Sequence, residues 1–429
     1  MALDAEGASL APGLIRLLLL SNGHGEDLSG ALLGKRLMAQ GIGVSALPLV
    51  GNGQAYHQMG IPIEGPTREF STGGLGYTSL VGRLTELIQG QIFYVAGRLI
   101  RLWRQRHRYG LIVVVGDVVP VIAARLAWRP ATVYLVAYSS HYEGRLRLPW
   151  PCGQLLRSPR VLKVWSRDEL TASDLEKQLG REVEFLGNPF MDLVNRSGPP
   201  PLERTVQTMG LLPGSRLPEA LRNLELMLRM LPLLPAPLKQ PNRLELHAAL
   251  VKGLQSELVI PMARTLGWSP EPPGAETSAE GQLQQVLVLG ELRLHLHWSA
   301  FAEVLNQSDL LLSMTGTAAE QGVGLGKPVL QLVGQGPQFT PGFAEAQRRL
   351  LGPGVRCIAG PSGAVATLKA SAALAEELLT RLADPEHGPT WKEELARIGR
   401  QRIGTAGGGL RMAAAIMALL QPPRPDRHG

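Results

Sequence analysis

The most constraining feature of this chain is a regular alternation of short apolar runs with segments of helical periodicity. In the first half, a run such as residues 111–115 is apolar at every position, as in strands buried on both faces of a sheet. Because helical segments separate these runs, the strands need crossover connections and are expected to be parallel. The predicted strands are residues 14–20, 44–50, 111–115, 132–138, 161–165 and 183–186, and the predicted helices are 28–40, 54–59 and 121–128.

The same alternation resumes after residues 196–202, a segment with three consecutive prolines that we interpret as a linker. The predicted strands of the second half are residues 206–212, 243–248, 286–289, 310–313 and 329–332. A chain of 429 residues is too long for one core and fits two domains. We therefore predict an α/β protein of two Rossmann-like, doubly wound domains facing a central cleft.

The predicted N-terminal domain comprises residues 1–198, and the predicted C-terminal domain comprises residues 199–400. Residues 401–429 are predicted to form a helix that packs back toward the N-terminal domain, followed by a disordered tail. The loop at 269–282 and the tail from 421 onward are rich in Pro, Gly and Ser and are expected to be mobile.

Composition limits the partners and the compartment. A net charge of +7 suits an acidic substrate, a nucleic acid or an anionic membrane surface. No basic run is interleaved with aromatic residues, so we favour the membrane and expect no nucleic acid. Cys152 and Cys357 are far apart and lie in no Cys-x-x-Cys setting, which favours a reducing cytoplasm over a disulfide framework or a zinc site.

The N-terminal run at residues 14–20 is interpreted as a buried strand and not as a signal peptide. It lacks a basic leader and follows the acidic residues Asp4 and Glu6. No segment reaches the roughly 18 apolar residues that a membrane-spanning helix requires.

The segment Leu-Leu-Pro-Gly-Ser-Arg at residues 211–216 combines a strand end, a tight turn and a helix start. Gly214 permits a tight backbone, and the free amides of the first helical turn are expected to face Arg216. Pro218 is predicted in that first turn, where it gives up an amide without a helical partner. A helix N-terminus beside a guanidinium binds phosphate, so we predict a diphosphate site at Gly214, Ser215 and Arg216. The alternative is an ordinary turn.

A second motif, residues 310–321, again joins a buried strand, a small-residue turn and a helix. The backbone of Thr315, Gly316 and Thr317 is expected to face phosphate, as at other helix N-termini. Glu320 falls one helical turn beyond Gly316, where its carboxylate can accept from the two vicinal hydroxyls of a ribose. With the neighbouring Gln321, these residues and the first motif predict a nucleotide-sugar donor site. The alternative is that Glu320 is a solvated helix residue and that the glycines only pack.

Two polar residues follow strands of the first sheet and are candidate catalytic groups. His24 lies after the first strand and Asp117 after the strand at 111–115, so both are expected at the carboxyl edge of that sheet. Either can serve as the base for an acceptor hydroxyl, or Asp117 can orient His24 and stabilise its charged form. The structural alternatives are that His24 caps the first helix and Asp117 is the N-cap of the next one. Glu26 and Asp27 are expected to form the first turn of a helix.

Two further features of the sequence receive no single functional assignment. His295 and His297 alternate along a strand, but no third ligand lies nearby in the sequence, so no metal site is predicted. The segment 77–108 combines apolar residues with an arginine-rich face, which suits either a helix on an anionic bilayer or an amphipathic helix packed on the sheet. Its arginines are Arg83, Arg98, Arg101, Arg104, Arg106 and Arg108.

With these motifs in hand, the chain resembles the lipid-A-disaccharide synthase group of glycosyltransferases, in particular related proteins of cyanobacterial type. The likeness runs from the first strand to the last helix. It rests on the segments at 211–216 and 315–320, on Gly116-Asp117, and on Phe-Leu-Gly-Asn-Pro-Phe-Met-Asp at 185–192. It implies the GT-B fold, a UDP-sugar donor in the C-terminal domain, no metal or cofactor, and inversion at the anomeric carbon.

The resemblance also implies roles for individual residues. Asp117 stands at a position essential for activity, Arg216 would touch the donor diphosphate and Glu320 its ribose. The family joins two acylated glucosamine units at a membrane surface, which implies a cytoplasmic enzyme peripheral to the inner, or plasma, membrane. The acceptor-side residues are Asn22, Gly23, Gly25, Glu26, Tyr138 and Ser139.

The acceptor side departs from the family pattern. Synthases carry a first loop of Gly-Glu-x-Ser-Gly-Asp type, whereas Ser-Asn-Gly-His-Gly-Glu-Asp at residues 21–27 looks more like the His-bearing loops of lipid-linked sugar transferases. Residues 137–144 replace the aromatic acceptor segment.

Three functions follow from these features. The first is an inverting transfer of an N-acetylglucosamine-type or acylated glucosamine sugar from a UDP-sugar to a lipid-linked acceptor. The others are a UDP-GlcNAc 2-epimerase, which shares the fold and the donor site, and a non-catalytic UDP-sugar or lipid sensor.

Overall fold

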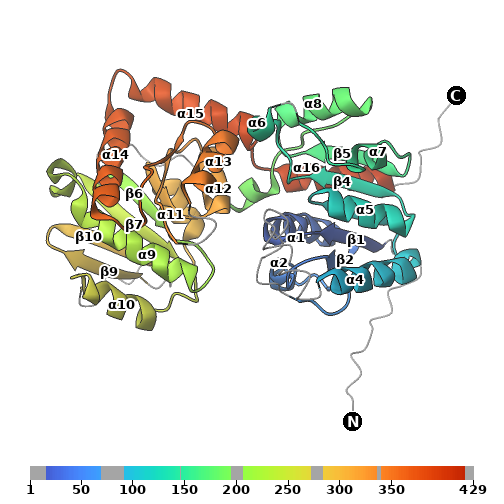
Figure 1. The fold of residues 1–429 in the computed structure, drawn as a ribbon, viewed down its shortest axis with the longest axis horizontal. Coiled ribbons are helices and arrows are strands. Elements are labelled where there is room, and N and C mark those ends of the chain that lie inside the picture. Colours follow the sequence, from blue (N-terminus) through green and yellow to red (C-terminus); the bar gives the residue numbers. More distant parts are fainter. Residues whose placement is uncertain are drawn as a thin grey trace, which may run out of the picture. The chain divides into compact units, whose positions relative to one another are not determined.

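The computed structural model describes residues 16–68, 91–144, 146–194, 206–271, 284–335 and 340–420, which divide into two compact units (Figure 1). Unit 1 comprises Met1–Phe190 and Ala406–Gly429, and Unit 2 comprises Met191–Thr405. The units therefore end at different residues from the predicted domains, whose boundaries were 198 and 400. The predicted linker at 196–202 lies outside the described residues.

Unit 1 contains a five-stranded sheet with the order β2-β1-β3-β4-β5, in which every neighbouring pair is parallel. The strands are β1 (Arg16–Ser21), β2 (Gly43–Pro48), β3 (Leu111–Val115), β4 (Ala131–Leu135) and β5 (Val161–Ser166). The predicted strand at 183–186 is wrong, because the pairing described there is an isolated bridge between Trp165 and Glu184.

Helices cover both faces of this sheet, because alternate strand residues point to opposite sides. Leu17 and Leu19 pack in one cluster with side chains of α1 and α16, whereas Leu18 and Leu20 pack in a second cluster with side chains of α4, α5, α7 and α8. The helical segments are α1 (His24–Met38), α2 (Gln54–Gln58), α4 (Gln91–Gln105), η2 (Arg106–Arg108), α5 (Val118–Ala127), α6 (Ser140–Glu143), α7 (Cys152–Leu156), α8 (Glu169–Leu179), η3 (Pro189–Leu193) and α16 (Gly408–Leu420).

The C-terminal helix α16 belongs to Unit 1 although the whole of Unit 2 precedes it in the chain. It packs on α1, and the Arg411 side chain donates from Nε to the carbonyl of Leu186 at 2.7 Å. At Gly408, a β-carbon would lie 2.6 Å from the backbone nitrogen of Asn188. The helix therefore starts where only glycine lets the two backbones approach.

Unit 2 contains an eight-stranded sheet with the order β13-β12-β11-β6-β7-β10-β9-β8. All its pairs are parallel except those of β9, which is antiparallel to β10 and β8. The strands are β6 (Gln207–Leu212), β7 (Leu244–Leu250), β8 (Ser269–Pro270), β9 (Gln284–Leu289), β10 (Leu292–Trp298), β11 (Leu310–Ser313), β12 (Val329–Gln331) and β13 (Val355–Cys357).

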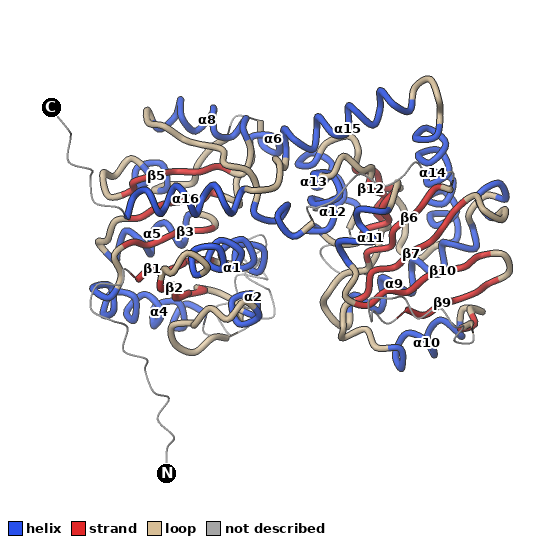
Figure 2. Tube along the Cα trace, turned by 180° about the vertical axis from the view of Figure 1, so that it is seen from behind, coloured by secondary structure: helices blue, strands red, loops and turns tan. Residues whose placement is uncertain are grey.

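The helices of Unit 2 also flank its sheet, as the blue segments on either side of the red strands show (Figure 2). The helical segments are α9 (Glu219–Met230), η4 (Leu231–Leu233), η5 (Ala236–Lys239), α10 (Ser256–Thr265), α11 (Phe301–Gln307), α12 (Gly316–Gly324), α13 (Pro341–Leu351), α14 (Val365–Ala383) and α15 (Gly388–Arg402). The mixed α/β architecture with parallel sheets is confirmed. Both candidate half-sites lie at the carboxyl ends of central parallel strands, where such sheets usually bind ligands.

Candidate functional site

The two donor-side motifs meet at one edge of the sheet in Unit 2. Strand β6 pairs with β11 so that Leu212 lies opposite Ser313, and the Met314 amide donates to the Leu212 carbonyl at 3.1 Å. Gly214 has a φ of +115°, and a β-carbon there would lie only 2.9 Å from Cγ2 of Thr315. Two turns about a hundred residues apart in the sequence are therefore in contact, and only glycine fits at this approach.

The first motif differs from the prediction in how its helix starts. Helix α9 begins at Glu219, so Pro218 precedes the helix instead of lying in its first turn. The Ala220 amide donates to the Arg216 carbonyl at 2.8 Å, so this amide is not free for a ligand. The chain makes a further turn over residues 215–218 before it becomes helical, and Ser215 and Arg216 are exposed there. Of the groups that the sequence analysis expected to bind phosphate at this turn, the exposed Arg216 side chain remains.

The second motif retains its helix N-terminus. Helix α12 starts at Gly316, and the preceding Thr315 is extended and makes no side-chain cap. The amides of the first turn of a helix have no partner within the helix, so this turn offers donors to an anion. Glu320 is half-buried and Gln321 is buried, both on the same helix.

Two buried glutamines near this turn were missed by the sequence analysis. Gln347 of α13 is 7% exposed, and its Nε2 atom lies 3.4 Å from the position of a β-carbon at Gly316. Gln331 ends β12 and is 5% exposed. Within the described ranges the Oε1 atoms of both side chains have no hydrogen-bond partner. Neither residue belongs to a recognisable motif, so the sequence carries no signal for them.

On the acceptor side, β1 leads through Asn22 and Gly23 into α1, and His24 is the first residue of the helix. Gly23 is the N-cap and makes no side-chain cap, so His24 is not the capping residue. His24 is half-buried, and its Cε1 lies 3.9 Å from the position of a β-carbon at Gly51. Gly25 is exposed in the first turn.

Asp117 combines the structural and the functional interpretation. It is the N-cap of α5, because its Oδ1 accepts from the Val119 amide at 2.8 Å. The Asn22 side chain also reaches it, with Nδ2 3.4 Å from each carboxylate oxygen. Burial raises the pKa of Asp117, although the hydrogen bonds from Val119 and Asn22 act in the opposite direction.

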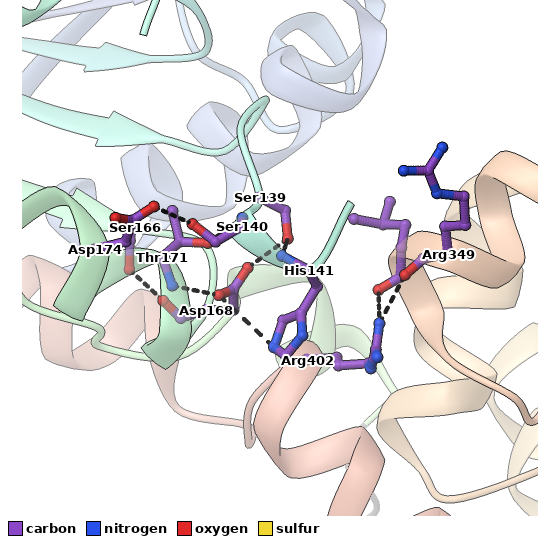
Figure 3. A network of polar contacts seen from close by, with 10 residues as sticks. Ser139, Ser140, His141, Ser166, Asp168, Thr171, Asp174, Arg349 and Arg402 are labelled. Carbon is purple, nitrogen blue, oxygen red and sulfur yellow. Dashed lines mark hydrogen bonds and ion pairs between the residues drawn. The ribbon is translucent and has the colours of Figure 1, made fainter. Parts of the chain in front are cut away.

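The half-buried Tyr138 joins the same region, since its hydroxyl accepts from the Val118 amide at 3.1 Å. Ser139 does not offer its hydroxyl in the same way. It is 5% exposed, and its Oγ donates to Oδ2 of Asp168 at 2.8 Å in a buried network with Ser140 and Asp174 (Figure 3). This network fixes the loop after β4 against α8, which is a structural use of Ser139.

Glu26 and Asp27 lie in the first turn of α1 as predicted, where Glu26 is half-buried and Asp27 is buried. Asp27 is 1% exposed and accepts from Oγ of Ser21 at 2.5 Å, and the same Oγ lies 2.8 Å from the Tyr56 hydroxyl. The Asn22 amide donates to Oε2 of Glu26 at 2.9 Å. Burial raises the pKa of Glu26 to about 8 and that of Asp27 to about 7, and the charge of Asp117 adds to the rise at Glu26.

The histidines of β10 have a neighbour that the sequence analysis did not find. His247 of the adjacent strand β7 lies between His295 and His297, with ring centroids 5.0 and 5.1 Å away. Its Nδ1 is 2.9 Å from Nε2 of His297, and the rings are stacked. Burial lowers the pKa of His297 to about 4. In the described part of the chain, no group of three or more His, Cys, Asp or Glu side chains has a geometry that could hold a metal ion.

The described part of the arginine-rich segment is α4 and η2, while residues 77–90 lie outside the described residues. Arg98 is buried and donates to the carbonyls of Pro48 and Glu64, so it is a structural residue and not part of a surface. Phe93, Ile100 and Trp103 are 81%, 53% and 53% exposed. No described helix is both long enough and apolar enough to cross a membrane.

Comparison with known proteins gives one relative in sequence and several in structure. No family model matches the chain. A lipid-A-disaccharide synthase from Trichlorobacter lovleyi is 26% identical over 259 residues, which cover 57% of this chain. The chain thus spans about three fifths of that relative's length, since 59% of it is covered.

Three solved structures cover most of the chain. The calicheamicin glycosyltransferase CalG4 matches with a TM-score of 0.56 and 16% identity, over 96% of this chain and 100% of CalG4. The glycotransferase of kitacinnamycin matches with a TM-score of 0.55 and 16% identity, over 95% of this chain and 99% of that protein. S. aureus MnaA with UDP matches with a TM-score of 0.51 and 14% identity, over 95% of this chain and 97% of MnaA. The chain has the GT-B fold of glycosyltransferases, as predicted. Its predicted resemblance to lipid-A-disaccharide synthase is likewise confirmed by the sequence match.

Proposed function

We propose that this protein transfers an N-acetylglucosamine-type or acylated glucosamine sugar from a UDP-sugar to a lipid-linked acceptor, with inversion at the anomeric carbon. The observation that carries the proposal is the contact between the Gly214 turn and Thr315 at the start of α12. It joins a guanidinium, a helix N-terminus and the carboxylate of Glu320 at one sheet edge. These are the groups that a diphosphate and a ribose require.

The donor-side residues stabilise the leaving group. Arg216 is exposed beside the turn and can form two parallel hydrogen bonds to diphosphate oxygens. The first-turn amides of α12 add donors that face the same charge. Negative charge develops on the diphosphate as the bond to the sugar breaks, so both groups bind the transition state more tightly than the ground state.

The acceptor-side residues remove a proton. The acceptor oxygen forms a bond to the anomeric carbon while the bond from that carbon to the phosphate oxygen breaks, and UDP leaves with the electron pair. The acceptor proton passes to Asp117 or to His24. The raised pKa of Asp117 favours it as a base, because a carboxylate with a pKa nearer neutrality is a stronger proton acceptor.

The membrane is the proposed source of the acceptor. Phe93, Ile100 and Trp103 lie at helical spacing on α4 and are exposed, and Arg106 stacks over the Trp103 ring at 4.4 Å. Exposed aromatic residues beside arginines suit the headgroup region of an anionic bilayer. We propose a peripheral position on the cytoplasmic face of the inner, or plasma, membrane.

Calorimetry with UDP tests the donor site. The variant Arg216→Ala should bind UDP at least about tenfold more weakly, because a charge-assisted pair is lost. Arg222→Ala is the matched control, since Arg222 is an exposed arginine of α9 that contacts Glu219 at 3.6 Å. Equal UDP affinity of the wild type and Arg216→Ala contradicts the assignment.

Turnover separates the three candidate functions. Radiolabelled UDP-sugar is incubated with native membranes, and the released UDP and labelled lipid are identified. The transferase produces both, whereas a 2-epimerase produces UDP-ManNAc from UDP-GlcNAc alone. A sensor binds UDP but releases none from the donor with any lipid acceptor.

A further inference from the structure

Glu26 is the acidic residue of the α1 first turn whose carboxyl reaches the loop after β3. Its Oε2 accepts from the Asn22 amide at 2.9 Å. Its carboxyl atoms lie 3.0 Å from the position that a β-carbon would take at Gly116, where φ is +149°. Gly116 immediately precedes Asp117, so the absence of a side chain there makes room for Glu26 beside the candidate base.

Asn22 connects the two carboxyl groups. Its backbone amide donates to Glu26, while its side-chain Nδ2 lies 3.4 Å from both oxygens of Asp117. The Asn22 Oδ1 atom is buried and has no hydrogen-bond partner among the described residues.

The charges around Glu26 are mostly negative. Asp117 faces it from the β3–α5 loop, and Asp27 follows it on α1. Tyr56 of α2 also interacts with it, while Arg98 of α4 acts on Asp27. His24 lies on the same first helical turn. Two interacting carboxyls do not both ionise readily, and desolvation together with the charge of Asp117 raises the pKa of the half-buried Glu26 to about 8.

We propose that Glu26 is a positioning residue of the transfer reaction: through the Asn22 backbone amide it holds the Asn22 side chain against Asp117, the group that receives the acceptor proton. This inference rests on the proposed function. In the reaction the acceptor O–H proton goes to Asp117 as the oxygen bonds to the anomeric carbon and UDP departs. Glu26 keeps its own proton throughout and acts through Asn22.

The charge state of Glu26 predicts a pH profile. Ionisation of Glu26, with a pKa of about 8, puts a second negative charge beside Asp117, which disfavours the ionised form of the base. UDP release by the wild type should therefore decline above about pH 8. Glu26→Gln keeps a neutral acceptor for the Asn22 amide and removes this ionisation, so its profile should lack the decline.

The experiment measures kcat and KM for UDP release, with radiolabelled UDP-sugar and native membrane lipids, between pH 6 and 9.5. Glu26→Leu should lower kcat at least about tenfold, because the half-buried Asn22 amide loses its partner. Glu26→Gln should restore most of that loss. Glu169→Gln is the matched control, because Glu169 is an exposed acidic residue in the first turn of α8. UDP affinity should not change in any variant.

Two results overturn the inference: a decline above pH 8 that persists in Glu26→Gln, and a Glu26→Gln variant as inactive as Glu26→Leu. Carboxyl ¹³C NMR of Glu-labelled protein is independent of turnover. A signal that titrates near pH 8 in the wild type and is missing in Glu26→Gln supports the inference even where no lipid is glycosylated. In that case the proposed function is refuted and the inference about Glu26 is not. Conversely, a Glu26 signal that titrates near pH 4.5 refutes the inference and leaves the proposed function untouched.

Discussion

Replacing Glu26 by glutamine should make the stability of Unit 1 less dependent on pH. A carboxyl whose pKa rises from its ordinary 4.5 to about 8 in the folded state binds more protons when folded than when unfolded between these two values. Stability then falls as pH rises, because ionisation of the unfolded chain is favoured. The contribution of Glu26 to the free energy of unfolding is fully present below pH 4.5 and is lost as the pH rises to about 8. Glutamine does not titrate, so the variant lacks this loss.

The magnitude follows from the pKa values. At about 1.4 kcal/mol for each pH unit, the interval from 4.5 to about 8 corresponds to at most about 5 kcal/mol. Asp27 changes in the same direction between 3.8 and about 7, so it keeps part of the slope in the variant. We therefore expect Glu26→Gln to resemble the wild type near pH 5 and to exceed it by about 2 to 5 kcal/mol at pH 8.5.

Hydrogen exchange of the amides in β1 and β3 is the appropriate assay, because it reports the opening of Unit 1 without contributions from Unit 2. Exchange is measured at several pH values from 5 to 9 after correction for the intrinsic rate, in the wild type, Glu26→Gln and Glu169→Gln. The two glutamine variants should differ, with the control following the wild type. Parallel profiles of the wild type and Glu26→Gln would refute the buried, protonated state of Glu26.

Three further predictions concern the donor turn, the candidate base and α4. Gly214→Ala should weaken UDP binding at least about tenfold in calorimetry. Gly290→Ala is the control: the φ of Gly290 is also positive, at +59°, but nothing lies within 4 Å of its β-carbon position, so UDP binding should not change. Asp117→Asn should abolish UDP release while keeping the N-cap of α5. Asp117→Ala should also lower the free energy of unfolding by about 1 kcal/mol, because the cap is lost. Full turnover of Asp117→Asn contradicts the role of Asp117 as the base. Trp103→Ser should reduce sedimentation of the protein with anionic vesicles. Trp150 lies in a loop and is 83% exposed, so Trp150→Ser is the control and should not change sedimentation. Equal losses in both variants contradict the proposal that α4 contacts the membrane.

The strands that the sequence predicted best are those buried on both faces. Residues 111–115 and 310–313 are strands over the predicted residues, because a continuous apolar run leaves no other place for these side chains. The predicted strand at 183–186 is interrupted by the charged residue Glu184 and makes only an isolated bridge there. The strand Val355–Cys357 was not predicted, since three residues carry too little pattern.

The site was predictable where it depends on local chemistry. A strand, a small-residue turn and a helix start identified the turns at Gly214 and Thr315, and the pairing of β6 with β11 brings them together. The burial of Glu26 was not predictable, because acidic residues in a first helical turn are usually solvated and Gly116 lies 90 positions away in the chain. His247 was missed for the same reason, since the register of β7 against β10 cannot be read from either strand.

The two interpretations of Asp117 left open by the sequence are compatible, and under the proposed function they indicate which carboxylate oxygen takes the proton. As the N-cap of α5, Asp117 uses Oδ1 to accept from the Val119 amide at 2.8 Å. Its Oδ2 makes the longer contact of 3.4 Å with Asn22. The cap thus fixes the rotation of the carboxylate and leaves Oδ2 as the less engaged atom beside the buried Oδ1 of Asn22. In the proposed reaction the acceptor hydroxyl therefore gives its proton to Oδ2 of Asp117. The helix cap thus orients the proposed base, and a substitution that removes the cap is expected to remove both functions at once.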